Sequence, residues 1–102
     1  MGRKPNIEVP GDKLADFCRR NHVRKLAFFG SVLRDDFQPT SDVDVLVEFL
    51  PVRPVGFLRM ARLELELTGI LGRKVDLRTP AELSRYFRDE VINGAEVQYA
   101  EG

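Results

Sequence analysis

A run of β-branched residues that carries two acids on one side constrains this chain most. Residues 42–50 read DVDVLVEFL, with valine at 43, 45 and 47 and aspartate at 42 and 44. Side chains alternate between the faces of a strand, so the three valines would face a core while Asp42 and Asp44 share the other face. Leu46 shares that acidic face, which indicates partial cover. Because aspartate is depleted in strands, this pair needs an explanation beyond local propensity.

The spacing of apolar residues predicts the elements around this strand. Strands are also expected at 25–30, at 73–79 and, along an edge, at 95–100, and helices at 12–22, 55–69 and from 79 to about 94. A turn is expected between Pro51 and Pro54. This alternation predicts one α+β domain over 1–102, a small mixed sheet layered with helices, with an irregular segment at 1–11.

Two helix boundaries carry specific signals. Gly69 and Gly72 are expected to end the helix that starts near residue 55. Thr79, Pro80 and Glu82 predict the start of the last helix, because a threonine cap, a proline at the first helical position and a glutamate two residues later form a capping box. Its apolar stripe would contain Leu83, Phe87 and Val91.

The composition excludes several classes of function. Sixteen basic residues balance sixteen acidic ones, so no net charge drives the chain to nucleic acid or a membrane. Its single cysteine, Cys18, excludes an internal disulfide and a multi-cysteine metal site. No apolar stretch is long enough to span a membrane, and the N-terminus has no hydrophobic signal core. We therefore expect a cytoplasmic protein with no membrane partner and no direct contact with nucleic acid.

The acids indicate either a solvated polar face or a cation site. Asp76 adds a third acid on another short strand, where its apolar neighbours point the other way. Mg²⁺ prefers such oxygen ligands and keeps water and phosphate oxygens in the rest of its shell. Two acids from one strand and one from a neighbour are what a two-metal phosphoryl-transfer site needs. We predict that Asp42, Asp44 and Asp76 bind Mg²⁺, with two ions expected.

Gly30 and Ser31 offer an anion-binding turn after a predicted strand. A glycine that ends a strand before a helical turn leaves backbone N–H groups free for phosphate, and the Ser31 hydroxyl can donate one more hydrogen bond. Arg34 follows one turn later, where its guanidinium can reach a phosphate or pair with Asp35 or Asp36. Together with the acids, this turn predicts a metal–nucleotide site.

The stretch GSVLRDDFQPTSDVDVLVEF resembles the signature of minimal nucleotidyltransferases (MNT proteins) of the DNA polymerase β superfamily. That signature is Gly-Ser, ten intervening residues, Asp-x-Asp and a later single Asp. KVDLRT and the closing YFRDEVINGAEVQYA also resemble stand-alone MNT proteins, the antitoxins found beside HEPN ribonuclease toxins, so the resemblance covers nearly the whole chain. MNT proteins often carry Arg-Gly-acid where this chain has Arg34-Asp35-Asp36.

The resemblance implies a polymerase β-like fold, ATP as substrate and Mg²⁺ as cofactor. By position, it assigns triphosphate binding to Gly30, Ser31 and Arg34 and metal binding to Asp42, Asp44 and Asp76. Asp76 would also be the general base. The implied reaction transfers AMP from ATP to a tyrosine of a cognate HEPN toxin and silences it.

Two other functions remain open from the sequence. A non-catalytic antitoxin would neutralise its partner by binding alone, although such a role does not require three acids. A small-molecule nucleotidyltransferase would need an additional substrate-binding part. Template-directed polymerisation is disfavoured, because the chain has no nucleic-acid-binding lobe or basic groove.

Overall fold

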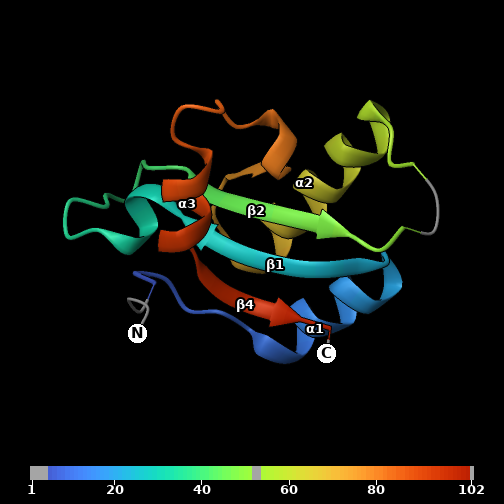
Figure 1. The fold of residues 1–102 in the computed structure, drawn as a ribbon. Coiled ribbons are helices and arrows are strands. Elements are labelled where there is room, and N and C mark those ends of the chain that lie inside the picture. Colours follow the sequence, from blue (N-terminus) through green and yellow to red (C-terminus); the bar gives the residue numbers. More distant parts are fainter. Residues whose placement is uncertain (1–4, 52–53, 102) are drawn as a thin grey trace.

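Four strands form one mixed sheet in the computed structural model of the protein, which describes residues 5–51 and 54–101. The strands are β1 (Val23–Phe29), β2 (Val43–Phe49), β3 (Val75–Arg78) and β4 (Glu96–Ala100). Their order in the sheet is β3-β2-β1-β4; β1 is antiparallel to β2 and β4, and β2 is parallel to β3 (Figure 1). The predicted α+β class with a small mixed sheet is confirmed, and β4 is the expected edge strand.

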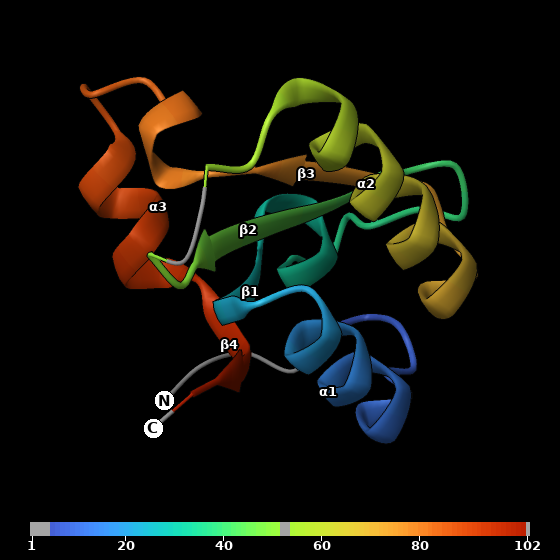
Figure 2. The same cartoon turned by 90° about the vertical axis from the view of Figure 1, so that its right-hand side faces the viewer.

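Helices lie on both faces of this sheet. The helices are α1 (Gly11–Arg20), α2 (Phe57–Leu71) and α3 (Arg88–Gly94). Figure 2 shows α1 and α2 together on one side of the strands and α3 on the other side. The sheet therefore has one face covered by two long helices and one face that α3 covers only in part.

The hydrophobic core fills the space between the sheet and the α1–α2 layer. Its buried side chains include Leu14, Phe17 and Cys18 of α1, Val43, Val45 and Val47 of β2, Leu63, Leu67 and Leu71 of α2, and Val75 and Leu77 of β3. The valine face of β2 is thus the core face, as the alternation predicts. Leu46 is buried on the opposite face, which confirms that the acidic side of the strand is partly covered.

The middle helix does not end at Gly69. α2 runs through that glycine to Leu71, and Gly72 ends it with a left-handed φ of 68° and an N–H donated to the Thr68 carbonyl at 2.9 Å. A glycine inside a helix is unfavourable by about 1 kcal/mol relative to alanine. Buried Leu67 and Leu71 on either side of it outweigh that penalty, so the helix continues for two more residues.

The last predicted helix divides into two parts. Thr79 and Glu82 form the expected capping box, but the helix it opens is a short 3₁₀ segment, η2 (Pro80–Glu82). Leu83 then takes an extended backbone and is buried, and the chain turns before α3 begins at Arg88. The predicted single apolar stripe is therefore wrong, and Phe87 is half exposed.

The N-terminal boundary also differs slightly. α1 begins at Gly11, so the irregular segment within the described residues is 5–10 rather than reaching 11. Residues 1–4 of that prediction, and residues 52–53 of the turn between Pro51 and Pro54, lie outside the described residues. Across the part of the chain that is described, no helix is long and apolar enough to cross a membrane.

Candidate active site

The turn after β1 brings a glycine into contact with an acid of β2. Gly30 opens the 3₁₀ segment η1 (Gly30–Leu33) with a φ of 74°, a conformation that favours glycine. The Asp44 carboxylate lies against its α carbon, so closely that a Cβ at position 30 would collide with Asp44 Oδ2. Position 30 must therefore be glycine for two reasons, its backbone angle and the neighbouring acid.

Asp44 and Asp76 lie directly opposite one another on the parallel strands β2 and β3. Both are half-buried, and both alternate with core residues, which places them on the face away from α1 and α2. Asp42 is one residue before the start of β2 and is exposed. The structure therefore brings two of the three predicted acids into register and leaves the third at the rim.

Two basic side chains that the sequence analysis did not consider pair with these acids. Arg78 binds Asp76, with Nε 3.1 Å from Oδ1 and Nη2 3.3 Å from Oδ2. The ammonium of Lys74 lies 4.0 Å from Asp42 Oδ2. Within residues 5–51 and 54–101, no three His, Cys, Asp or Glu side chains are grouped as a metal site would hold them. The predicted three-acid arrangement is thus not assembled in this conformation.

The charges of the three acids still act on one another. Partial burial raises the pKa of the Asp44 carboxyl, and the neighbouring charges of Asp76 and Asp42 raise it further, while Arg78 and Arg34 oppose the shift. A carboxylate held among like charges in a partly buried place is stabilised by a cation. This electrostatic environment suits a bound positive charge next to Asp44.

The donor set fits a hard divalent cation. Asp42, Asp44 and Asp76 supply only oxygen atoms, which Mg²⁺ binds in preference to nitrogen or sulfur. Because Gly30 has no Cβ, the Asp44 carboxylate packs directly against the turn after β1, so an ion bound by Asp44 would lie next to the backbone of that turn. The chemistry of the residues therefore fits a magnesium–nucleotide complex, with Asp76 available once Arg78 is displaced.

In this conformation, Arg34 pairs with an acid of the loop after η1. Its Nε lies 3.3 Å from Asp36 Oδ1, so the guanidinium pairs within the loop in this conformation. The pair is largely exposed on both sides, and such pairs contribute little to stability. Ser31 is half-buried in η1, where its carbonyl accepts the Arg34 N–H at 2.9 Å.

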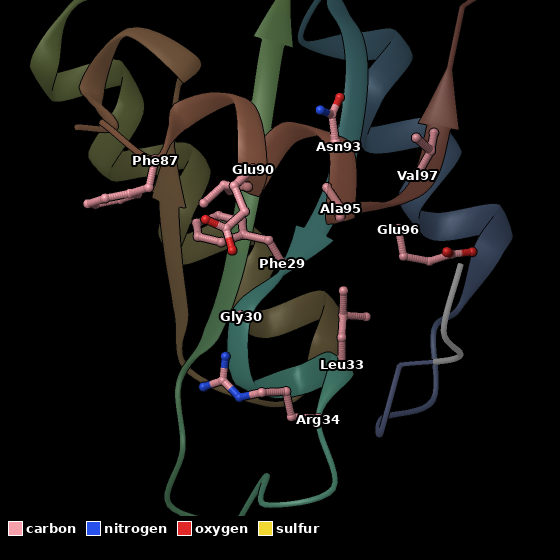
Figure 3. A pocket seen from close by; sticks show the side chains of 12 residues that line it. Phe29, Gly30, Leu33, Arg34, Phe87, Glu90, Asn93, Ala95, Glu96 and Val97 are labelled. Carbon is pink, nitrogen blue, oxygen red and sulfur yellow. The ribbon is translucent and has the colours of Figure 1, made fainter. Parts of the chain in front are cut away.

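An open pocket of about 1110 Å³ adjoins this turn (Figure 3). Gly30 and Arg34 contribute to its wall, but the three acids do not. In Figure 3, Glu90 of α3 and Arg34 lie on either side of Gly30. The other lining residues come from the β1 end and from the α3–β4 segment: Phe29, Leu33, Phe87, Val91, Asn93, Gly94, Ala95, Glu96 and Val97. Sequence reasoning missed the α3 contribution, because it treated 79–94 as one helix.

Asn6 is a second contributor that sequence reasoning missed. Its amide Nδ2 donates to the Val32 carbonyl at 2.8 Å and to the Arg34 carbonyl at 2.7 Å, and its backbone N–H donates to Val32 at 2.9 Å. These bonds fasten the N-terminal segment across η1. A lone asparagine in an irregular segment gives no sequence signal of such a contact.

The chain matches a known protein family over most of its length. The nucleotidyltransferase domain family matches residues 12–97. A protein of Methanocaldococcus jannaschii named "Putative protein adenylyltransferase" is 32% identical over 90 residues, which cover 88% of this chain and 95% of that relative. Five further adenylyltransferase relatives are matched over 54% to 64% of their own length, so this chain spans little more than half of them.

Solved structures agree with the fold. A "putative minimal nucleotidyltransferase" is 34% identical with a TM-score of 0.68, and the match covers 83% of this chain and 85% of that one. A toxin–antitoxin structure with AMP-PNP has a TM-score of 0.72 at 19% identity, and covers 91% of this chain and 75% of that one. At that identity the second likeness shows the fold alone.

Proposed function

Because this chain belongs to the nucleotidyltransferase domain family, and within it to the minimal nucleotidyltransferases, we propose that it transfers AMP from ATP to a protein hydroxyl. The proposed acceptor is a tyrosine of a HEPN-type toxin, and the transfer makes the chain an antitoxin. The observation that carries the proposal is the contact between Gly30 and Asp44, which joins a phosphate-binding turn to an acid of β2.

The residues of the turn would bind the nucleotide. The N–H groups of Gly30 and Ser31 and the Ser31 hydroxyl donate hydrogen bonds to the triphosphate. Arg34 already lines the pocket beside Gly30. To bind a phosphate oxygen, its guanidinium needs only to release Asp36, and that ion pair is exposed and contributes little free energy.

The acids would hold the metal and take up the proton. Asp42, Asp44 and Asp76 are the proposed ligands of Mg²⁺, with two ions expected. Bound Mg²⁺ would neutralise negative charge on the triphosphate and so lower the barrier to attack on the α-phosphorus by the acceptor oxygen. Asp76 accepts the proton of the acceptor hydroxyl, whose oxygen bonds to the α-phosphorus as the bond to the β-phosphate breaks and pyrophosphate leaves.

The partner is proposed from the surroundings of the pocket and from the structural neighbours. Phe87 and Val97 line the pocket and are half exposed, and Tyr86, the residue before Phe87, is 85% exposed, so these three side chains give the pocket and its surroundings an exposed apolar rim. Such a rim suits a protein partner that supplies the second wall of the site. One neighbour in fold is a chain from the structure of a tri-AMPylated Shewanella oneidensis HEPN toxin in complex with its MNT antitoxin.

Transfer of labelled AMP tests the proposal. The purified chain is incubated with ATP labelled on the α-phosphate, Mg²⁺ and a candidate HEPN toxin, and the toxin is then analysed for label and for ribonuclease activity. Label on a toxin tyrosine supports the enzyme. An inhibited toxin without label would instead establish neutralisation by binding.

A pair of matched variants sharpens this test. Asp42→Asn should lower the transfer rate by about a thousandfold, since electrostatic groups at such sites contribute that much. Asp35→Asn makes the same change of charge at an exposed acid of the neighbouring loop and should transfer at close to the parent rate. Equal rates for the two variants would remove Asp42 from the site.

A further inference from the structure

Arg78 holds the third acid of the site in a two-point contact. Its Nε and Nη2 donate to the two oxygens of Asp76, at 3.1 Å and 3.3 Å. Both side chains leave β3 on the same face, because they are two positions apart in the strand, with Leu77 between them. A guanidinium fork that binds both oxygens of a carboxylate covers the lone pairs that a metal ion would use.

The charge of the same guanidinium also acts on Asp44 of the neighbouring strand. Asp44 is opposite Asp76 in the sheet, and Arg78 is opposite Leu46, the next residue of β2 on the acidic face. Among the residues that the structure describes, the Asp44 carboxylate has no ion-pair partner, and the positive charges of Arg78 and, to a smaller extent, Arg34 offset its charge from a distance.

We propose that Arg78 is a positioning residue that competes with a divalent cation for Asp76. The inference rests on the proposed function, because it takes Asp76 as a metal ligand. Arg78 pairs with Asp76 and offsets part of the charge of Asp44 when no cation is present, and it leaves Asp76 when a cation binds there. A metal ion must therefore displace a built-in positive charge as it enters the site.

Because the Arg78–Asp76 pair is partly exposed to water, a cation can replace Arg78 at Asp76 at little cost in free energy. The side chains of Arg78 and Asp76 are 47% and 36% exposed, and ion pairs in contact with water contribute little net free energy. A divalent ion has twice the charge of the guanidinium and would meet Asp44 as well. The released fork is then free to bind an oxygen anion, and a phosphate group matches its geometry.

Magnesium titration by calorimetry, without nucleotide or toxin, tests the competition. Arg78→Gln should bind Mg²⁺ about three- to tenfold more tightly than the parent chain, a change of the size expected when an exposed ion pair no longer competes. Arg24→Gln is the matched control, because it removes the same charge from an exposed arginine of β1. Equal Mg²⁺ affinities for Arg78→Gln and Arg24→Gln would overturn the proposal, as would no Mg²⁺ binding by either.

A second measurement follows Arg78 itself. In an NMR titration, the Nε–H resonance of Arg78 should shift and broaden as Mg²⁺ is added to the parent chain. In Asp76→Asn it should stay unchanged over the same range. An Nε–H signal of the parent chain that Mg²⁺ leaves unmoved, in a sample shown to bind the ion, would contradict the exchange.

These readouts separate the inference from the function on which it rests. Both use Mg²⁺ alone, so a failure of AMP transfer would leave a tightened Mg²⁺ affinity in Arg78→Gln intact. If AMP transfer proceeds but Arg78→Gln and Arg24→Gln bind Mg²⁺ equally, only the proposed role of Arg78 is contradicted, and the proposed function stands.

Discussion

The α carbon of Gly30 lies against the carboxylate of Asp44. The contact joins the end of β1 to β2 at the position where Phe29 is paired with Asp44 in the antiparallel register. Since the glycine has no side chain, the acid of one strand reaches the turn that follows the other. This contact fixes the separation between the proposed phosphate-binding turn and the proposed metal site.

Gly30→Ala should impair both folding and activity. An alanine with a φ of 74° is destabilising by about 1–2 kcal/mol, and its Cβ would also push Asp44 aside. Urea denaturation should show a fall in the free energy of unfolding of at least that size, and AMP transfer should be lost with it.

Gly69→Ala is the control for this substitution and should change stability in the opposite direction. Gly69 is inside α2, and a Cβ built there meets no atom within 4 Å. Alanine in that position should stabilise the fold by about 0.5–1 kcal/mol. A Gly30→Ala chain as stable as the parent would show that the turn can relax away from Asp44.

Asp44→Asn should stabilise the fold at neutral pH while it abolishes transfer. Burial and the charges of Asp76 and Asp42 raise the pKa of the Asp44 carboxyl, so its ionised form is penalised in the folded chain. A raised folded pKa means that stability falls as the pH rises through it. The melting temperature of the variant should therefore exceed that of the parent at pH 7.

The pH dependence checks the cause. The advantage of Asp44→Asn should shrink as the pH falls and vanish below the ordinary aspartate pKa of about 3.9, because the carboxyl is then protonated in both the folded and the unfolded chain. Added Mg²⁺ should raise the melting temperature of the parent and leave that of the variant unchanged. A constant difference across pH would exclude ionisation of Asp44 as the source.

Asn6→Asp should weaken ATP binding without unfolding the chain. The Asn6 amide donates to the Val32 and Arg34 carbonyls, and an aspartate of the same shape would set oxygen against oxygen. Each lost hydrogen bond contributes about 0.5–1.5 kcal/mol, so η1 should loosen and the KM for ATP should rise several-fold. Steady-state kinetics measure the KM for ATP. An unchanged KM would show that the Asn6 hydrogen bonds do not support the turn.

Cys18 should be inert in the native chain. It is fully buried in the core beside Phe17, and that burial raises the pKa of its thiol to about 12. The thiolate is the reactive form, so a disulfide reagent should modify the folded chain only as fast as it opens. The same reagent should react at once in denaturing urea. Rapid modification under native conditions would place the thiol at the surface.

The order of the elements could be predicted from local pattern alone. The alternation of valine and acid predicts both the β2 strand and its two faces, and the structure has the valines in the core. The boundaries that failed depend on tertiary packing. Burial of Leu71 carries α2 past Gly69, and burial of Leu83 breaks the last helix after its capping box.

The candidate site also has features that local sequence pattern predicts and features that depend on tertiary structure. The spacing of the Gly-Ser turn and the acids predicts one shared site; the structure has Gly30 against Asp44 and Asp44 opposite Asp76, with Asp42 at the rim. The charges that oppose the acids could not be predicted as readily, because only the sheet register brings Arg78 beside the acids of both strands. Asn6 was beyond prediction, since its contact with η1 spans 26 to 28 residues of sequence.

The alternation along β2 has a consequence for insertions and deletions. Core and proposed chemistry occupy residues of opposite parity on that strand, so a change of one residue within it would exchange their environments, turning Asp44 inward and Val45 outward. The exposed loop between η1 and β2 carries no such parity and should accept a change in length. Single-residue deletions scanned from this loop into β2 should therefore be tolerated at first and then abruptly prevent folding. The position of that change would mark the residue at which the alternation between core face and acidic face begins.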